Sequence, residues 1–420
     1  MTIGDRFHEI RTGFNRTFWI ANTLELFERM AFYGAKAVLA IFLAKKVGLE
    51  HEAGTLTGFF SALIYALPIF TGVLVDRYGF RKTLLGCFSI FSVGYFLVGM
   101  AGMEFGAGII GIAGKRAYVI IVLILTAVGG SLIKPCIVGT VAKTSKPTAK
   151  ALGFSIYYTL VNIGGSIGPI IALIVRQDFG IEYVLVMSSI TSLLLFIGTY
   201  FFFDEPADQN DADEKRTLKK VFFDMLLVFG NFRFMLFLII FSGFWLMFWQ
   251  IYYSFPFYIT DVLHYEKFEI LETVDAWCII VVTVPVTALF KSFKPHTAMI
   301  IGFLIASLSW IIIGAGGTIT ASIIGMGLFA LGEAIQAPRF YEYISIIAPK
   351  DQIGTFMGFA FLPLSIGSLT AGMIADWLRA TYLDTDPSFM WYAVSGFGIT
   401  STIFMIVYNV LFNRKTDLAG

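Results

Sequence analysis

The sequence predicts an all-α integral membrane protein of twelve transmembrane helices, arranged as two bundles of six. Three observations support this fold class. First, 57% of the 420 residues are hydrophobic and 14% are charged, whereas soluble globular chains carry about 25% charged residues. Second, the hydrophobic residues gather in runs of roughly 20, the length that spans a bilayer. Third, one long polar stretch near the middle leaves six runs on either side.

The first bundle is expected over 1–203. Its six runs are joined by short polar connections, and each run is long enough to cross the hydrocarbon core of a lipid bilayer. They cover 17–45, 55–75, 83–102, 117–142, 151–175 and 181–203.

The second bundle is expected over 232–420, after a linker at 204–231. The linker opens with mixed acidic and basic residues, and its segment 221–230 is apolar enough to lie along the membrane surface as an amphipathic segment. The six runs that follow cover 232–260, 271–290, 297–316, 319–346, 354–378 and 388–412.

The placement of lysine and arginine predicts that both termini are cytoplasmic. Cytoplasmic loops of membrane proteins carry an excess of these two residues. With the N-terminus inside, 19 of the 30 basic residues fall in cytoplasmic segments and 7 in outer loops. We therefore expect a multi-pass protein embedded in a lipid bilayer, and the short loops favour a bacterial inner membrane.

The composition also excludes several functions. A net charge of +1 offers no basic patch for nucleic acid. Cys87, Cys136 and Cys278 lie far apart, and the four histidines fall in polar connections, so no metal site is indicated. The sequence shows no phosphate-binding loop and no nucleophile elbow. We expect neither an enzyme nor a cofactor, and we expect the chain to act as a monomer.

The first span carries charges on one face. At about 100° per residue, Glu25, Glu28, Arg29, Tyr33 and Lys36 fall on a strip of the helix about 140° wide. Charges at membrane depth are costly and normally face a cavity or a pathway. Structural ion pairs are the alternative, with Glu25 and Arg29 four residues apart. Two acids and two bases exceed what packing needs, so we expect a functional site.

The connection between the second and third runs has a recognisable pattern. Gly72, Asp76, Arg77 and Arg81 stand in an order that resembles the GxLxDRxGRRK loop of the major facilitator superfamily. Six plus six spans with a cytoplasmic linker is also that superfamily's layout, so the resemblance implies the major facilitator fold. We expect Asp76, Arg77 and Arg81 to form a gate that latches neighbouring helices. An ordinary positive-inside loop is the alternative.

A second resemblance extends along nearly the whole chain. The ExxER pattern of the first span, followed by tyrosine, glycine and a cation, resembles the signature of the proton-dependent oligopeptide transporter (POT/PTR) family. Similar motifs follow in order in five further spans. The matching segments are 25–36, 60–68, 129–136, 154–164, 244–250 and 332–338. The resemblance implies a proton-coupled symporter of di- and tripeptides that works by alternating access.

The residue types in these motifs suit a zwitterion. A peptide presents a carboxylate, which long cationic side chains bind well, and an ammonium group, which needs an acid. Tyrosine, tryptophan and amide side chains are typical of small-molecule pockets. The predicted substrate-binding residues are Arg29, Tyr33, Lys36, Tyr65, Lys134, Tyr158, Asn162, Trp245, Gln250 and Glu333.

Some of these residues have other interpretations. Packing is the alternative for Tyr65, Tyr158 and Trp245, and Lys134 could instead extend toward the interface. Arg339 and Glu342 lie off the face of Glu333, so we expect a cytoplasmic gate pair rather than substrate ligands.

Glu25 and Glu28 are the predicted proton-coupling residues. Desolvation favours the neutral form of a carboxylic acid, and a nearby cation favours the charged form. Close to Arg29, Lys36 and Lys134, such an acid acts as a switch. When it is protonated, the bases are released to hold a substrate carboxylate; when it loses the proton, the ion pairs form again.

Several positions depart from the family's pattern and leave the substrate open. Lys36 replaces a usual arginine, Cys136 an asparagine, Trp249 an acid and Asp275 an asparagine, while Ala360 lacks the expected aromatic ring. The substrate could be an amino acid or a modified peptide. Two other classes remain: a transporter of the superfamily for an organic anion, and a non-transporting receptor or scaffold.

Overall fold

Proline and glycine mark where the helices begin, bend and end. The computed structural model describes residues 12–206, 217–349 and 352–412. Within these residues the chain forms helices and no strand, which confirms the all-α class. The helices divide into two compact units, each described by itself below: the first contains 1–38 and 67–221, and the second contains 39–66 and 222–420.

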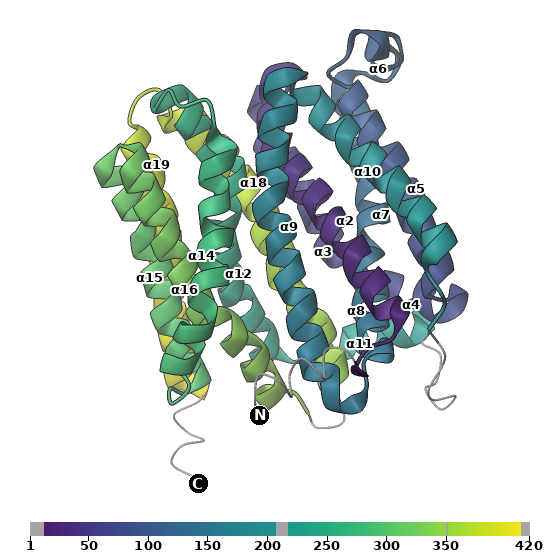
Figure 1. Cartoon of the computed structure of the whole chain (residues 1–420). Coiled ribbons are helices and arrows are strands. Elements are labelled where there is room, and N and C mark those ends of the chain that lie inside the picture. Colours follow the sequence, from purple (N-terminus) through teal and green to yellow (C-terminus); the bar gives the residue numbers. More distant parts are fainter. Residues whose placement is uncertain (1–11, 207–216, 350–351, 413–420) are drawn as a thin grey trace. The chain divides into compact units, whose positions relative to one another are not determined.

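The first unit is a bundle in which α5 packs against both α7 and α10 (Figure 1). Glycine lets two of its helices approach closely: a Cβ at Gly168 of α9 would lie 2.4 Å from the carbonyl oxygen of Met30 in α2. The helices are α2 (Arg16–Ile41), α4 (Pro68–Tyr78), α5 (Phe80–Met100), α6 (Ala107–Ala113), α7 (Lys115–Ser131), α8 (Ile133–Thr144), α9 (Lys150–Asp178) and α10 (Ile181–Phe202). The last residues of α2, from Leu39, belong to the second unit.

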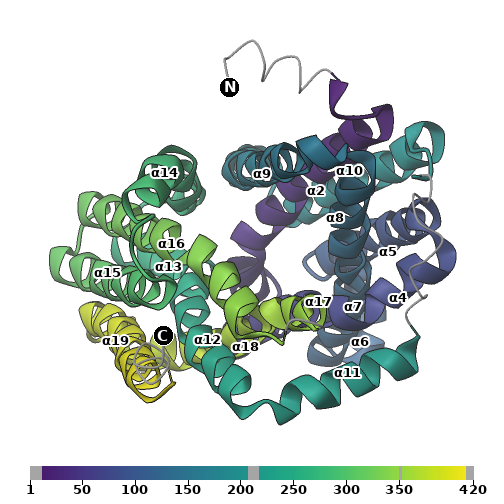
Figure 2. The ribbon, with the colours of Figure 1, turned by 90° about the horizontal axis from the view of Figure 1, so that it is seen from below.

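The second unit is built around α16 and α18. α16 packs against α14 and α15, and α18 packs against α3 and α12. Figure 2 looks along the helices and shows α14, α15, α16 and α19 side by side. The helices are α3 (Ala53–Ala66), α12 (Phe232–Tyr253), α13 (Phe255–Phe257), α14 (Phe268–Leu289), α15 (Pro295–Gly316), α16 (Ile319–Ile347), α17 (Ile353–Gly358), α18 (Leu362–Tyr382) and α19 (Pro387–Phe412).

Each predicted membrane run coincides with described helices. Among the described residues, ten helices are long and apolar enough to span a membrane, or eleven if α3 and α4 count as one bent span. α2 is long enough as well, with 26 residues, but it carries four charged side chains beyond its first turn. The total of twelve spans therefore stays a prediction, and every predicted run is helical.

The second predicted span is broken in the middle. α3 ends at Ala66 and α4 begins at Pro68, with a bend of 45° between the two segments. Proline lacks the N–H that would continue the helical hydrogen bonds, so the break falls at this residue. α3 then belongs to the second unit because it packs against α18.

The predicted division into 1–203, 204–231 and 232–420 stays a prediction. Residues 207–216 of the predicted linker lie outside the described residues, as do both termini. The predicted amphipathic segment 221–230 falls within α11 (Leu218–Gly230), a helix that exposes Phe222, Phe223 and Leu226.

Candidate functional site

The buried charges of α2 form the centre of the candidate site. The side chains of Glu25, Glu28, Arg29 and Lys36 are at most 3% exposed. A charge that is removed from water needs a partner of opposite sign or hydrogen bonds. The charged face that the sequence predicts is thus a buried strip along one continuous helix.

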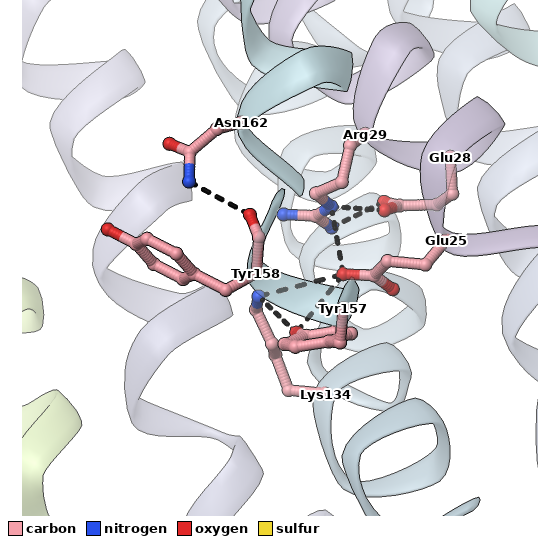
Figure 3. A network of polar contacts seen from close by, with 7 residues as sticks. All are labelled: Glu25, Glu28, Arg29, Lys134, Tyr157, Tyr158 and Asn162. Atoms are coloured by element: carbon pink, nitrogen blue, oxygen red, sulfur yellow. Dashed lines mark hydrogen bonds and ion pairs between the residues drawn. The ribbon is translucent and has the colours of Figure 1, made fainter. Parts of the chain in front are cut away.

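Arg29 and Glu28 form a two-point ion pair. Nη2 of Arg29 donates to Oε1 of Glu28 at 2.6 Å, and Nε donates to Oε2. The same Nε lies 3.5 Å from Oε1 of Glu25, one turn earlier (Figure 3). Paired charge-assisted bonds are strong and directional. Glu28 is therefore held firmly, whereas Glu25 is held by Arg29 only at longer range.

Lys134 and Tyr157 complete the network from α8 and α9. The Lys134 ammonium donates to the Tyr157 hydroxyl at 2.9 Å and lies 3.7 Å from Oε1 of Glu25. The Tyr157 hydroxyl donates to that same oxygen at 3.3 Å. Oε2 of Glu25 is buried and accepts no hydrogen bond from the described residues. Glu25 is therefore the less satisfied of the two carboxylates.

Tyr157 is a network residue that the sequence analysis did not select. It selected the neighbouring Tyr158, whose side chain is 48% exposed and points away from the charges (Figure 3). Asn162 donates to the carbonyl oxygen of Tyr158 at 2.9 Å, within the turn of α9. Neither Tyr158 nor Asn162 joins the ion pairs.

A glycine seven residues later could have identified Tyr157. Positions 157 and 164 share a helical face. A Cβ at Gly164 would lie 2.6 Å from the Cβ of Arg29, so this face of α9 contacts α2. A small residue at that spacing therefore predicts which tyrosine faces the charged helix.

Aromatic rings lie against the cations of α2. The guanidinium carbon of Arg29 lies 4.6 Å from the ring centre of Phe32 and 6.0 Å from that of Tyr33. The Lys36 ammonium lies 5.4 Å from the Phe32 ring centre. The negative face of a ring attracts a cation. The structure therefore places Tyr33 near Arg29, and Lys36 against the same Phe32 ring that Arg29 contacts.

The second unit holds Glu333 in a contrasting environment. Glu333 of α16 interacts electrostatically with Asp275 of α14, and α14 packs on α16. Asp275 is 8% exposed, and Oδ1 of Asp275 and Oε2 of Glu333 are buried without a hydrogen-bond partner among the described residues. No lysine, arginine or histidine of the described residues forms an ion pair with either acid.

These two acids are suited to a cation. Two neighbouring carboxylates destabilise each other's charged form, so a bound proton or an ammonium group stabilises the pair. No third metal-ligating side chain of the described residues joins them. The sequence analysis identified Glu333 but could not place Asp275 beside it, because that neighbourhood depends on how α14 and α16 pack.

Gln250, another predicted substrate ligand, is used inside the protein. Its side chain is fully buried in α12, and Nε2 donates to the carbonyl oxygen of Ala371 in α18 at 3.1 Å. Oε1 accepts a hydrogen bond from Ser254 at 2.5 Å. Both ends of the amide are thus occupied, and the Nε2 end ties α12 to α18.

An aromatic cluster lies beside Gln250. Trp249 is 1% exposed, and its ring centre lies 5.6 Å from that of Tyr65 and 6.4 Å from that of Trp245. The indole nitrogen of Trp245 is buried without a hydrogen-bond partner among the described residues. Tyr65 and Trp245 are therefore placed together, and Trp245 keeps one donor available.

The predicted gate at 76–81 lies where α4 ends and α5 begins. Asp76 and Arg77 are exposed, and Nη2 of Arg81 donates to the carbonyl oxygen of Tyr200 in α10. The sequence analysis missed Glu205. Its two oxygens accept hydrogen bonds from the first two backbone N–H groups of α5, at 2.6 and 2.8 Å. A carboxylate in this position satisfies helix-terminal donors and the helix dipole.

The second predicted gate pair, Arg339 and Glu342, forms an ion pair on α16. Nη1 of Arg339 lies 2.6 Å from Oε2 of Glu342. Nη2 donates to the carbonyl oxygen of Phe290, just after α14, at 2.6 Å. Arg339 therefore links α16 to the end of α14.

Another polar link in the second unit was not expected from the sequence. Asp376 of α18 accepts hydrogen bonds from the backbone N–H groups of Gly54 and Thr55 at the start of α3, at 2.8 and 2.7 Å. Arg379 donates to Asp376 at 2.8 Å and to the carbonyl oxygen of Glu50 at 2.7 Å. The i,i+3 spacing of Asp376 and Arg379 is visible in the sequence, but their partner helix is not.

Comparison with known proteins agrees with these features. The family model described as Major Facilitator Superfamily matches residues 23–372. Dipeptide and tripeptide permease B of Shigella dysenteriae serotype 1 is 30% identical over 169 residues, which cover 39% of this chain and 32% of the permease. Dipeptide and tripeptide permease A of Escherichia coli K12 is 27% identical over 191 residues, which cover 44% of this chain and 36% of the permease. The match thus spans about a third of each relative.

Solved structures share the fold over nearly the full chain. A POT family transporter in complex with 5-aminolevulinic acid superposes with a TM-score of 0.78 at 16% identity, covering 95% of this chain and 97% of the other. The POT family transporter PepTSo superposes with a TM-score of 0.76 at 17% identity, covering 95% of this chain and 98% of the other. The resemblance to the POT/PTR family that the sequence motifs indicate is confirmed.

Proposed function

The chain belongs to the major facilitator superfamily, and on that premise we propose that it is a proton-coupled symporter of short peptides or related zwitterions that works by alternating access. One contrast carries this proposal. The first unit holds its cations in ion pairs that a proton can loosen, and the second holds two acids with no cation among the described residues. A zwitterion has the complementary charges for both.

The cations of the first unit are the proposed ligands of the substrate carboxylate. Arg29 presents a planar guanidinium that binds carboxylates at two points, and Lys134 supplies a point charge. Both are within ion-pair distance of Glu25. A substrate carboxylate would therefore compete with Glu25 for the same donors, while Lys36 adds positive charge to the same strip.

The acids of the second unit are the proposed ligands of the substrate ammonium. Glu333 is the predicted ligand, and Asp275 adds a second carboxylate beside it. Tyr33, Tyr65, Tyr158, Asn162, Trp245 and Gln250 remain the candidate walls of the pocket, and for Gln250 this role requires that it exchange one of its present hydrogen bonds.

Glu25 and Glu28 remain the proposed proton-coupling residues. Glu28 accepts two charge-assisted bonds from Arg29, which stabilise its charged form. Glu25 has one oxygen without a hydrogen bond and contacts of 3.3 to 3.7 Å at the other. A proton on Glu25 frees Lys134 for the substrate, and loss of that proton restores the ion pair between Glu25 and Lys134.

The relatives support peptides as the substrate class. They are permeases of dipeptides and tripeptides, but the matched part spans only about a third of their length. A smaller zwitterion is the second candidate, because the bulky Trp249 is buried beside Tyr65 and one structural neighbour is in complex with 5-aminolevulinic acid. An amino acid, an organic anion and a non-transporting receptor remain as outcomes of the test.

We further propose a bacterial inner membrane, cytoplasmic termini and a monomer. The described helices make the chain a multi-pass membrane protein, and the relatives are bacterial permeases. Asp76, Arg77, Arg81, Arg339 and Glu342 keep their proposed role as gate residues. The first three lie where α4 ends and α5 begins, and Arg339, the ion-pair partner of Glu342, links α16 to the end of α14. Under this proposal Asp76 and Arg339 lie on the cytoplasmic side.

The decisive experiment is uptake of labelled dialanine into proteoliposomes under an imposed inward proton gradient. We expect gradient-driven uptake by the wild type, loss of uptake in Glu333→Gln and Lys134→Ala, and loss of gradient dependence in the double variant Glu25→Gln/Glu28→Gln. Glu104→Gln and Lys291→Ala are matched controls, because both residues are exposed and distant in sequence from the site. Unchanged accumulation by the double variant would overturn the coupling role. Absence of uptake by the wild type would overturn peptide symport.

A further inference from the structure

The first unit has an apolar groove on the side of α2 that the charged network does not use. Its volume is about 670 Å³, and it is lined by side chains of α2, α9 and α10. Small-molecule sites have volumes of about 300–1,000 Å³. The lining includes Trp19, Phe27 and Met30 of α2, Ile171 of α9, and Leu194 and Gly198 of α10. A site of this size with an apolar lining is unsuited to a zwitterion.

The groove and the charges lie on opposite faces of one helix. At about 100° per residue, Ile20, Phe27 and Ala31 fall on the side of α2 opposite Arg29 and Lys36. Trp19, Phe27 and Leu194 are 41%, 46% and 61% exposed, so the groove opens outward from this unit. In a membrane-spanning bundle, such a surface meets acyl chains.

The length of the groove matches one leaflet. Its lining on α2 runs from Trp19 to Ala31, which is about 18 Å at 1.5 Å per residue. Half of a hydrocarbon core of about 30 Å is about 15 Å. An acyl chain that enters at Trp19 would therefore reach about the middle of the bilayer at Ala31.

One end of the groove is positively charged. Arg16, the first residue of α2, is exposed and lies on the groove face, three and four residues before Trp19 and Ile20. The chain segment that begins at Lys146 lies at the same end, because Lys146 donates its backbone N–H to the carbonyl oxygen of Gly13 at 2.9 Å. In the described ranges, neither Arg16 nor Lys146 forms an ion pair.

We propose that this groove binds a glycerophospholipid from the adjacent leaflet. One acyl chain lies along α2 between α9 and α10, and the phosphate pairs with Arg16, with Lys146 adding positive charge. Trp19 lies one turn inside Arg16, the depth at which indole rings are favoured at a membrane interface. The bound lipid would contact the back of the helix whose front carries Glu25 and Arg29. This proposal does not rest on peptide symport.

The groove has room for a test substitution. A Cβ at Gly198 would meet only Leu24 Cδ2, at 3.7 Å, which is ordinary van der Waals contact. Gly198→Phe therefore fills the groove without disturbing the helix backbone. Gly86→Phe is the matched control, because Gly86 of α5 has open space around it and lies outside the groove. Arg16→Gln removes the headgroup charge, and Lys291→Gln removes an exposed charge elsewhere.

The measurement is the number of phosphatidylglycerol molecules that the delipidated, detergent-purified full chain retains after this lipid is added back, counted by native mass spectrometry. We expect one retained lipid to be lost in Gly198→Phe, and about fivefold weaker retention in Arg16→Gln, the effect of one basic residue near anionic lipid. Gly86→Phe and Lys291→Gln should retain lipid like the wild type. Equal retention by Gly198→Phe, or equal weakening by both glycine variants, would overturn the proposal. Loss of peptide uptake in any variant does not bear on it.

Discussion

The charged residues of the two units differ in whether their charges are balanced. In the first unit, Glu25 and Glu28 face Arg29 and Lys134, so the acids and bases neutralise each other. Arg29 donates to Glu28 at 2.6 Å, and Glu25 lies 3.5 Å from Arg29 and 3.7 Å from Lys134. In the second unit, Asp275 and Glu333 lie together with no cation from the described residues. A balanced network is stable without a ligand, whereas an unbalanced pair is completed by one. The first is suited to switching and the second to receiving a cation.

The largest test of this comparison removes a base from the balanced network. Arg29→Ala leaves Glu25 and Glu28 buried with one cation fewer. We expect the free energy of unfolding to fall by about 3–5 kcal/mol, the cost of breaking a buried ion pair by deleting one partner. Chemical denaturation in detergent measures this free energy. Arg77→Ala is the control, because Arg77 is exposed. An equal loss of stability in the control would show that burial of the ion pair is not the cause.

The second test makes the same acid-to-amide change in both units. Asp275→Asn should raise the free energy of unfolding by about 1–3 kcal/mol, because it removes a buried charge without a partner. Glu25→Gln should lower it, because Lys134 and Arg29 lose a counterion. The same denaturation assay at pH 7.5 compares both with Asp178→Asn, an exposed acid. Changes of the same sign in the two units would contradict the comparison.

The third test concerns the hydroxyl that links Lys134 to Glu25. Tyr157→Phe removes both of its hydrogen bonds and should cost about 1–1.5 kcal/mol of stability. Since a donor to a carboxylate stabilises its charged form, we expect the pH of half-maximal proton-driven uptake to move upward. Uptake measured as a function of pH checks this shift. Tyr158→Phe should leave the pH dependence of uptake unchanged. An equal shift in both variants would contradict the proposed role of the Tyr157 hydroxyl.

The smallest effect is expected outside the membrane charges. Glu205→Gln weakens the cap on the first turn of α5 and should lower the stability of the first unit by about 1 kcal/mol or less. Thermal unfolding in detergent, with Glu104→Gln beside it, measures the difference. If Glu205→Gln unfolds like the wild type, the cap contributes no stability.

The sequence predicts the helices and the charged strip well because both depend on local pattern. Apolar runs of spanning length identify the helices, and 100° per residue places Glu25, Glu28 and Arg29 on one face before any tertiary contact is known. The bend in the second span has an equally local cause, since Pro68 removes a backbone donor.

Contacts between helices are what the single sequence leaves open. Tyr157 and Tyr158 are adjacent, and only the packing of α9 against α2 decides which of them reaches Glu25. Asp275 lies 58 positions before Glu333 in the chain, and only the packing of α14 on α16 brings them together. Gln250 has a family motif around it, yet its side-chain amide donates to α18 and accepts from Ser254. Residue type predicted the chemistry of these positions but not their partners.

The continuity of α2 has a mechanical consequence. The chain passes from one compact unit to the other three times: within α2 after Val38, at the break before Pro68, and within α11. At the first passage α2 is unbroken. A rotation of its final turn is therefore transmitted along the continuous helix to Lys36 and Arg29. At the second passage Pro68 removes a helical hydrogen bond, so the helix can bend there. The first connection therefore transmits a rotation to the charged residues, while the second absorbs it.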